Sequence, residues 1–323
     1  MEKKTVSDVI INRLLADVEK EGSMPWQRPY KMYNSFNYFT LNTYRGINRI
    51  LLPFGEYMTA HQINEYNKKH GEDYRFQKGI EWYPVVFFKV DDKEVSRDIV
   101  EKKFPDVDLD NVDGYIGNEN SFVYFKQGDI FFKRRKILKY TNVAERRYFK
   151  NSKGECLPSR LDTGEVEVIL EEPERLIRNY ISKEGIKVRE TGGCPCYIPG
   201  LDMIEMNYTC KGSELYSTFF HEMAHSTGSV NRLCRDAVTR TTNNNKEEYA
   251  KEECLAEIVA CLCCAECGIH DIKTSEIDSY KNSVAYVSYW KKKVKDWGKE
   301  FIFIVSEADK AFDRILSSLE EEL

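Results

Sequence analysis

The stretch Leu215-Tyr-Ser-Thr-Phe-Phe-His221-Glu222-Met-Ala-His225-Ser-Thr-Gly228 contains the pattern H-E-x-x-H in a setting typical of a helix. Two histidines four residues apart on a helix differ by about 40° in direction and by about 6 Å along the axis, so both imidazoles can point at one metal ion. Glu222 flanks the same face. The pattern therefore predicts a zinc site in which His221 and His225 are ligands and Glu222 takes a proton from metal-bound water.

The same five-residue pattern also arises by chance, so the neighbouring residues on the helix decide between a metal site and a coincidence. The histidine side of the helix otherwise carries small or polar residues, and the apolar residues lie on the opposite side. These are Glu214, Ser217 and Thr218 on the histidine side, and Tyr216, Phe219 and Met223 on the other. Gly228 stands where a helix would stop. A metal site is thus favoured over histidines that merely pack in a core.

The third ligand distinguishes the subclasses of such sites. The longer pattern H-E-x-x-H-x-x-G-x-x-H is not completed, because Asn231 occupies the last position. His61 and His70 lie in the other half of the chain, which leaves His270 or a carboxylate as the third ligand. Downstream, Glu253 and Glu257 share one face of a predicted helix with small residues, and buried carboxylates of this kind need a counter-charge. We therefore predict Glu253 as the third ligand and Glu257 as an acceptor that orients an imidazole N–H. Glu252 points about 100° away and is interpreted as a solvated flank; an exposed acidic helix is the alternative.

Charge is distributed unevenly along the 323 residues. Counted from Lys and Arg minus Asp and Glu, the net charge is +4 for residues 1–150 and −9 for residues 151–323, which sum to −5. The amino-terminal half can therefore meet a polyanion although the whole chain is acidic. A length of this order favours two domains, and the polar stretch 151–164 is the best candidate for a boundary.

Several features favour a cytoplasmic protein without a membrane segment. No apolar run approaches about 18 residues, and the chain begins with an amphipathic pattern that differs from a signal peptide. The ten cysteines include four on one predicted helix, which a disulfide framework would rarely place together. We interpret these four as small buried side chains: Cys261, Cys263, Cys264 and Cys267.

Aromatic residues beside Arg and Asn suggest a surface for single-stranded nucleic acid near the amino terminus. The candidate contacts are Trp26, Tyr44, Arg45 and Asn48. Rings can stack on unpaired bases while Arg and Asn hold phosphates. Core packing with a solvated rim would produce the same composition.

A basic cluster gives a second candidate for DNA contact. Gly128-Asp129 predicts a hairpin between strands at 121–127 and 130–140, and its second arm carries Lys133, Arg134, Arg135 and Lys136. The cluster is a candidate phosphate track. Charges that guard a sheet edge would look similar.

Residues 91–120 hold ten acidic and four basic residues and are interpreted as a surface insertion. Asp106 to Asp113 resemble the start of a calcium loop. Asn111 replaces the obligatory glycine and Gly117 the bidentate glutamate, so the segment is interpreted as a solvated loop. The remaining patterns predict helices near 6–20 and 172–184 and strands near 82–89 and 203–206. The strand near 203–206 could offer its edge to an extended substrate.

Together, four segments resemble the ArdC-type antirestriction family. They are Tyr44-Arg45-Gly46-Ile47-Asn48, Trp82-x-Pro84-Val-Val-Phe, Phe220 to Gly228 with Arg232-Leu233, and Tyr249-Ala-Lys-Glu-Glu253-x-x-Ala-Glu257. The resemblance implies an α+β protein with an N-terminal α/β single-stranded-DNA-binding domain, residues 1–155. It also implies a mainly helical zincin-like metallopeptidase domain with a small sheet, residues 165–323.

The leading hypothesis is therefore an antirestriction protein that binds single-stranded DNA and carries a zinc peptidase site. Zinc on His221, His225 and Glu253 would lower the pKa of its open-position water to about 7, and Glu222 would accept the proton. Tyr197 and His270 are open candidates for the group that stabilises the oxyanion. The alternative is a DNA-binding inhibitor of restriction enzymes with a structural zinc and no proteolysis; a host restriction enzyme or another protein is the expected partner.

Overall fold

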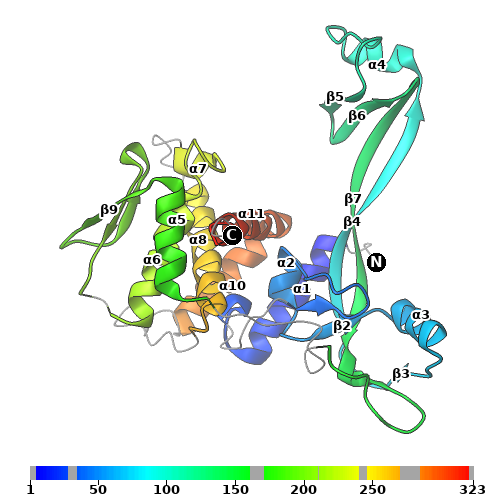
Figure 1. The fold of residues 1–323 in the computed structure, drawn as a ribbon, viewed down its shortest axis with the longest axis horizontal. Helices are drawn as coiled ribbons and strands as arrows, with labels where there is room; N and C mark the ends of the chain where they lie inside the picture. Colours follow the sequence, from blue (N-terminus) through cyan, green and yellow to red (C-terminus); the bar gives the residue numbers. More distant parts are fainter. Residues whose placement is uncertain are drawn as a thin grey trace. The chain divides into compact units, whose positions relative to one another are not determined.

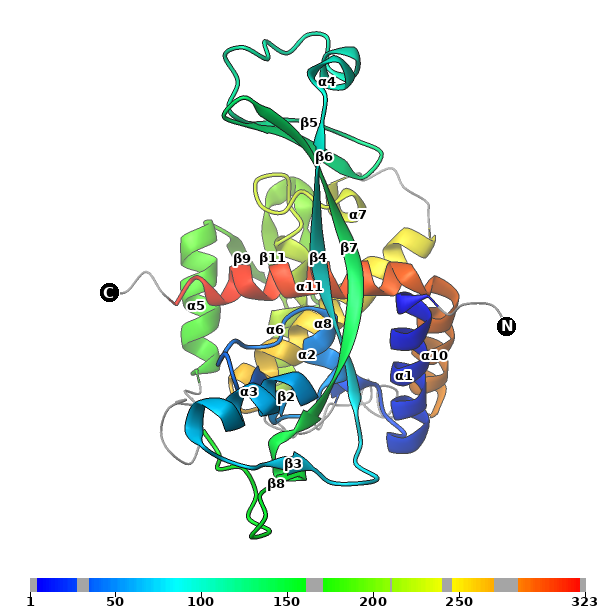
Figure 2. The ribbon, with the colours of Figure 1, turned by 90° about the vertical axis from the view of Figure 1, so that its right-hand side faces the viewer.

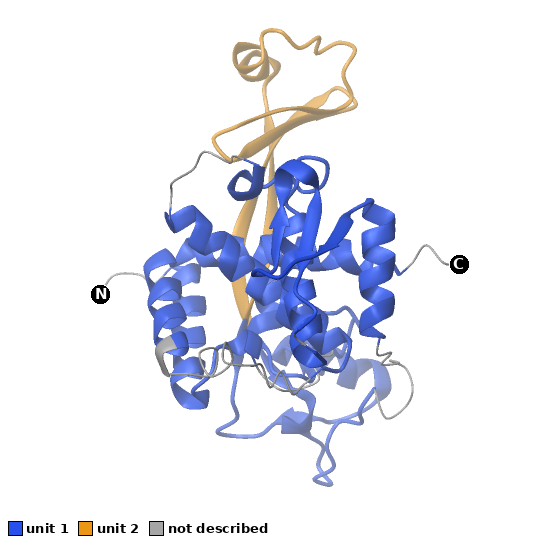
Figure 3. Cartoon of the chain, turned by 90° about the vertical axis from the view of Figure 1, so that its left-hand side faces the viewer, with its two compact units in different colours: residues 1–84, 142–323 blue, residues 85–141 orange. Residues whose placement is uncertain are grey.

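The structure is a computed structural model that describes residues 5–27, 35–160, 171–209, 211–239, 246–269 and 284–319. The chain divides into two compact units (Figure 3). Unit 1 comprises Met1–Pro84 and Asn142–Leu323, and unit 2 comprises Val85–Thr141. The predicted boundary between residues 155 and 165 falls partly outside the described residues, so the division into 1–155 and 165–323 stays a prediction. The predicted α+β class is confirmed: strands dominate the amino-terminal half and helices the carboxyl-terminal half.

The amino-terminal part of unit 1 combines short strands with three helices. Its elements are α1 (Val6–Glu21), η1 (Pro25–Gln27), β1 (Phe36–Asn37), α2 (Ile47–Leu51), β2 (Glu56–Met58), α3 (Ala60–His70) and β3 (Arg75–Phe76). The predicted first helix is confirmed: Thr5 and Asp8 form its capping box, and Gly22 ends it in the left-handed conformation. A core of buried side chains forms around α3, with Tyr38, Met58, Ile63, Phe149 and Leu157 among its members.

Unit 2 is a long two-stranded ribbon with a small folded tip (Figures 1 and 2). Its elements are most of β4 (Tyr83–Val95), α4 (Arg97–Lys103), β5 (Gly114–Glu119), β6 (Phe122–Gln127) and most of β7 (Ile130–Glu145). The predicted hairpin is confirmed by the pair Gln127–Ile130. β4 and β7 pair with each other, and β7 also pairs with β6, which pairs with β5.

The acidic segment 91–120 is more ordered than the sequence suggested. It contributes the end of β4, α4 and β5, and its Leu109 is only 3% exposed in a core with Val100 and Ile116. The ring of Phe104 lies so close to Gly117 that an added Cβ would be 2.4 Å from it. Residues 106–113 form neither helix nor strand, as expected of the predicted solvated loop, but the segment covers an apolar core and is only partly solvated.

The carboxyl-terminal part of unit 1 packs helices on a small sheet. After η2 (Arg146–Tyr148) and β8 (Phe149–Lys150), its elements are α5 (Pro173–Glu184), β9 (Lys187–Glu190), β10 (Cys196–Ile198), η3 (Pro199–Leu201), β11 (Met203–Met206), α6 (Ser213–Ser226), α7 (Asp236–Thr239), α8 (Lys246–Glu266), α10 (Val284–Trp297) and α11 (Lys299–Leu316). The predicted elements near 172–184 and 203–206 and both site helices are confirmed. Helix α6 packs against β10, β11 and α8, and α8 also packs against α11.

The two ends of the chain share one core in unit 1. Helix α1 contacts α10 and α11, α2 contacts α11, and η1 contacts α8. Of the four cysteines that were interpreted as small buried side chains, Cys263 and Cys264 are at most 1% exposed, whereas Cys261 and Cys267 are only half-buried. Among the described residues, no helix combines the length and apolar character needed to cross a bilayer.

Candidate metal centre

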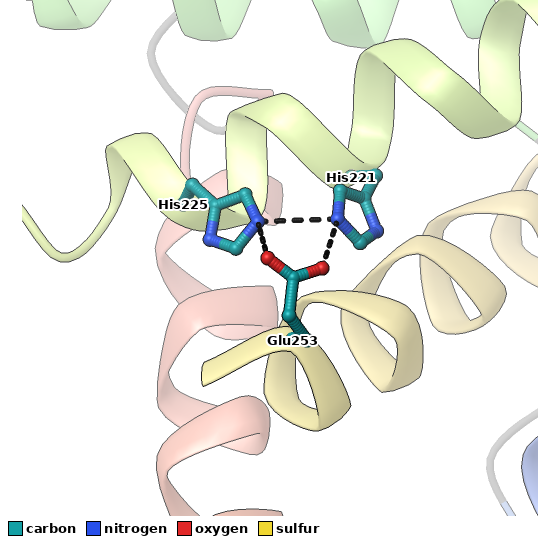
Figure 4. A group of neighbouring side chains, drawn as sticks. All are labelled: His221, His225 and Glu253. Carbon is teal, nitrogen blue, oxygen red and sulfur yellow. Dashed lines mark hydrogen bonds and ion pairs between the residues drawn. The ribbon is translucent and has the colours of Figure 1, made fainter. Parts of the chain in front are cut away.

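Helix α6 carries both predicted histidine ligands on the side that faces α8. Its apolar residues anchor it, since Phe219 is 6% exposed and Phe220, Met223 and Ala224 are fully buried. The side chains of His221, His225 and Glu253 point toward a common centre between the two helices (Figure 4). The i, i+4 spacing on α6 and the packing of α6 on α8 thus bring together three residues that lie up to 32 positions apart in sequence.

The three predicted ligands lie at short and nearly equal separations. The Nε2 atoms of His221 and His225 are 3.1 Å apart. Glu253 Oε2 lies 3.4 Å from Nε2 of His221, and its Oε1 lies 3.6 Å from Nε2 of His225. A tetrahedral ion with bonds of about 2.1 Å would separate its ligands by about 3.4 Å. The geometry of this donor set therefore fits one metal ion, and the part of the chain described here contains a metal-ion site.

The charges of the cluster stabilise one another although burial opposes them. Burial by itself favours the neutral forms of Glu253 and His225. The neighbouring imidazoles nevertheless lower the pKa of Glu253 to about 2. The carboxylates of Glu252, Glu253 and Glu222 raise the pKa of His225. Glu253 is therefore an ionised carboxylate in this environment, the form that binds a cation.

Glu222 lies next to the ligands on α6. Its side chain is 7% exposed, and its negative charge is felt by His225 and by Tyr249. A nearly buried carboxylate beside two metal-ligating imidazoles is suited to accept a proton from a nucleophilic water. The role of Glu222 as a base stays a prediction.

Glu257 lies behind His221, as the helical projection suggested. Its Oε2 is 3.9 Å from Nδ1 of His221, which is longer than a hydrogen bond. Its Oε1 accepts a hydrogen bond of 2.9 Å from the hydroxyl of Tyr286 on α10. His221 is therefore too far away for a direct hydrogen bond to this oxygen, and the role of Glu257 as an acceptor that orients an imidazole stays a prediction.

The interpretation of Glu252 as a solvated flank is wrong. Its side chain is 6% exposed, and its Oε1 lies 3.2 Å from Nδ1 of His225. Arg235 donates to both carboxylate oxygens, from Nε at 2.9 Å and from Nη2 at 2.6 Å. The projection failed because the segment after α6 covers a second side of α8, and no spacing in the sequence indicates that Arg235 lies there.

The group that stabilises the oxyanion was expected to be Tyr197 or His270, and the structure adds Tyr249 as a third residue near the metal site. Tyr249 was not predicted: it lies one turn before Glu253 on α8, and its interaction with that carboxylate is the main cause that raises its pKa to about 12. The hydroxyl of Tyr197 donates to Oδ1 of Asp202 at 2.7 Å, so it belongs to a structural network with Arg232. His270 lies outside the described residues.

In the small sheet, the strand near 203–206 is not an edge strand, in contrast to the expectation from the sequence. Its order is β10–β11–β9, so β11 is the central strand and pairs on both sides. The expectation that the strand near 203–206 offers its edge is therefore wrong. Among the described strands, β10 and β9 form the edges, and β10 contacts α6.

Of the predicted DNA contacts in unit 1, Trp26 needs correction. It is 1% exposed and packs with ring centroids 6.5 Å from Trp290 and 5.9 Å from Phe301. A ring enclosed on this scale cannot stack on a base, so Trp26 is a core residue here. The composition could not show this because its partners lie more than 260 positions later.

The other three residues of this group are at least partly accessible. Tyr44 is half-buried, and its hydroxyl accepts a hydrogen bond of 3.2 Å from Asn37. Arg45 has an exposed side chain and pairs with Asp313 on α11 at 3.0 Å. Asn48 is half-buried on α2. Their role in DNA binding stays a prediction.

The basic cluster of unit 2 is divided between two faces of the ribbon. Lys133 and Arg135 lie over the ring of Phe122, at 5.3 and 5.6 Å from its centroid. Arg134 lies over Phe125 instead and donates to both oxygens of Asp92 at 2.8 Å. Lys136 is exposed and shares the face of Arg134, because strand side chains alternate. The four charges therefore do not form one continuous track.

Two family models match separate parts of the chain. The model of a zincin-like metallopeptidase matches residues 175–308, and that of the N-terminal domain of the anti-restriction factor ArdC matches residues 4–131. Among curated proteins, the uncharacterized protein y4eC of Sinorhizobium fredii is 22% identical over 316 residues, which cover 94% of this chain and 89% of y4eC. A DNA primase TraC of Escherichia coli is 25% identical over 325 residues, which cover 98% of this chain but only 20% of TraC.

Solved structures share the fold. The Mn(II)-bound structure of the antirestriction protein ArdC from plasmid R388 superposes with a TM-score of 0.63 at 20% identity, covering 99% of this chain and 100% of that one. Its metal-free structure gives a TM-score of 0.61 at 22% identity, covering 98% of each chain.

Proposed function

Because the chain belongs to the ArdC-like antirestriction family, with an ArdC-type N-terminal domain and a zincin-like metallopeptidase domain, we propose that it binds single-stranded DNA and hydrolyses peptide bonds at a zinc site. The observation that carries the peptidase half is the convergence of His221, His225 and Glu253 beside the nearly buried Glu222. The DNA half is supported by the basic and aromatic side chains of unit 2.

Two imidazoles and one carboxylate are the ligand set of a gluzincin-type site and favour zinc over the harder divalent ions. When bound, the ion supplies Lewis acidity toward a water molecule and toward the substrate carbonyl. His221 and His225 would hold it through their imidazole nitrogens, and Glu253 through its carboxylate. The Mn(II)-bound structure of R388 ArdC makes manganese the natural competitor in a test of metal identity.

Glu222 acts as the proton carrier of the proposed reaction. Its carboxylate accepts a proton from the attacking water and then delivers it to the leaving amine. A position one residue after His221 places the carboxylate beside the ligand cluster without making it a ligand. Tyr249, one turn before Glu253, offers its hydroxyl as a donor toward the substrate oxyanion.

The edge strand β10 is the best candidate to hold a protein substrate. An extended segment can add to a sheet edge through backbone hydrogen bonds. β10 is an edge among the described strands and contacts the helix that carries the histidines. A host restriction enzyme or another protein would bind in this way.

Single-stranded DNA is proposed to bind the ribbon of unit 2. Phe87, Phe88 and Tyr140 are 47%, 60% and 42% exposed, and Lys136 and Lys139 are also exposed. Exposed rings interleaved with cations match the needs of unpaired bases and phosphates. Affinity for an oligonucleotide should then fall steeply with salt, and equal binding at low and high salt would contradict the proposal.

The decisive experiment on catalysis uses Glu222→Gln. We expect the variant to bind zinc as the natural chain does, while hydrolysis of unstructured peptides, followed by mass spectrometry, falls by at least about 100-fold. Retained hydrolysis would exclude Glu222 as the base. Protection of incoming DNA that survives Glu222→Gln but is lost on neutralising Arg45 or residues 133–136 would instead favour a non-proteolytic inhibitor with a structural metal.

A further inference from the structure

Arg235 is a nearly buried arginine whose polar contacts converge on the end of α6 and on α8. It is 9% exposed. Besides its two bonds to Glu252, it donates from Nη1 to the Thr227 hydroxyl at 2.7 Å and from Nη2 to the Ala224 carbonyl at 2.8 Å. Its guanidinium thus binds the Ala224 carbonyl at the α6 terminus, which also accepts a hydrogen bond from the Thr227 hydroxyl, while it holds the carboxylate on α8.

Glu252 connects Arg235 to the predicted metal ligand His225. Its Oε1 accepts from both Nη2 of Arg235 and Nδ1 of His225. A carboxylate can only accept, so Nδ1 carries the proton of the neutral imidazole and Nε2 keeps its lone pair. Nε2 is the atom that lies 3.1 Å from Nε2 of His221 and 3.6 Å from Glu253. The lone pair is therefore directed at the metal position.

Gly228 makes room for this arrangement. An added Cβ would lie 2.7 Å from Cγ2 of Val238 and 2.8 Å from Nη2 of Arg235. The backbone reinforces the position, since the Arg235 N–H donates to the Gly228 carbonyl at 3.0 Å and the Leu233 N–H to the Thr227 carbonyl at 2.9 Å. The glycine that follows the H-E-x-x-H pattern is thus required by the close approach of Arg235.

We propose that Arg235 and Glu252 are positioning residues that fix the Nδ1–H tautomer and the orientation of His225 and so set the affinity of the metal site. The proposal rests on the metal site of the proposed function and assigns no role in proton transfer to either residue. Glu252 needs Arg235 because a carboxylate that is 6% exposed and bonded only to a neutral imidazole would lack a counter-charge.

Three variants test the pair by different routes. Glu252→Gln places an N–H donor against either Arg235 or His225. Arg235→Lys keeps the charge but loses the planar fork. Gly228→Ala leaves every polar group in place and displaces Arg235. We expect each variant to weaken Zn²⁺ affinity by about 10- to 100-fold, as measured by chelator competition.

The matched control is Glu184→Gln. Glu184 is also a nearly buried carboxylate, 7% exposed, and it pairs with Arg232 and Arg314 at 2.8–2.9 Å without touching a metal ligand. Its loss costs stability of the same kind, so we expect a lower melting temperature with Zn²⁺ affinity within about threefold of the natural chain. Unchanged affinity in all three test variants, or an equal loss in Glu184→Gln, would overturn the proposal.

A second readout does not depend on metal binding. In the metal-free protein, ¹⁵N chemical shifts of the His225 imidazole should show the Nδ1–H tautomer, and Glu252→Gln or Gly228→Ala should raise the share of the Nε2–H tautomer. An Nε2–H tautomer in the natural chain would overturn the inference. Failure of the natural chain to bind Zn²⁺ at all would instead contradict the proposed function, so the two failures can be told apart.

Discussion

The metal centre of unit 1 and the ribbon of unit 2 both concentrate charged side chains, but they hold them in opposite ways. At the centre, His225, Glu252 and Arg235 are nearly buried and meet at 2.6–3.2 Å. On the ribbon, Lys136 is exposed, and Arg134 pairs with Asp92 while both remain more than 30% exposed. Breaking a buried pair costs about 3–5 kcal/mol, whereas an exposed pair contributes about 0–1 kcal/mol.

The difference agrees with the roles proposed for the two regions. A ligand set must be held in one geometry before the metal arrives, so its charges are fixed by other charges. A surface for a flexible polyanion gains from cations that can move and exchange partners. Substitutions at the centre should therefore have large, local effects, and substitutions on the ribbon should have small effects that depend on salt.

The largest effect is expected from loss of a ligand. His221→Ala should weaken Zn²⁺ affinity by about 10³-fold, because one of three protein ligands is removed and a charge of the cluster is left unbalanced. Isothermal titration with competing chelator measures this. The variant in which residues 133–136 are all replaced by Ala is the control and should bind Zn²⁺ as the natural chain does; a shared loss would show that the two regions are not independent.

The next largest effect separates Trp26 from the accessible aromatic residues. Trp26→Ala should lower the free energy of unfolding by about 3 kcal/mol, since it opens a cavity against Trp290 and Phe301. Tyr140→Ala, at a side chain that is 42% exposed, should change it by less than about 0.5 kcal/mol. Urea denaturation measures both. A change in the free energy of unfolding that is equally small for both variants would contradict the assignment of Trp26 to the core.

The sequence predicted the metal centre well because helical spacing determines it. His221 and His225 share a face by geometry alone, and Asn231 directs attention to a carboxylate on another helix. Glu253 was found by projecting that helix, and it lies where the projection indicated. The same projection misplaced Glu252, since α8 is covered on a second side by a segment whose path the sequence does not reveal.

The surface proposed for nucleic acid was less predictable because exposure depends on tertiary contacts. Trp26 and the exposed Phe88 have the same aromatic character in sequence, yet one is enclosed by the last helices and the other is accessible. The run of residues 133–136 looked continuous, but a strand sends alternate side chains to opposite faces.

This alternation leads to a quantitative prediction for DNA binding. Each phosphate contact contributes about 0.7 to the salt slope of single-strand affinity, so four contacts would contribute about 2.8. Because Lys133 and Arg135 share the face of the buried Tyr124 and Phe131, we expect only Arg134 and Lys136 to contribute. Neutralising all four should then lower the slope by about 1.4, measured by fluorescence anisotropy from 0.05 to 0.3 M salt. A decrease near 2.8 would mean that both faces meet the DNA.

The smallest predicted effect is a gain. Arg134 is held by Asp92 through two bonds of 2.8 Å, and this pairing competes with any phosphate. Asp92→Asn should remove the competitor of this phosphate contact and raise oligonucleotide affinity at 0.15 M salt by at most about fourfold, the value of one complete contact. Asp129→Asn removes the same charge at the hairpin turn and is the control. An equal gain in both variants would indicate that affinity responds only to net charge. A gain confined to Asp92→Asn would indicate that the single-stranded DNA binds the face that carries Arg134 and Lys136.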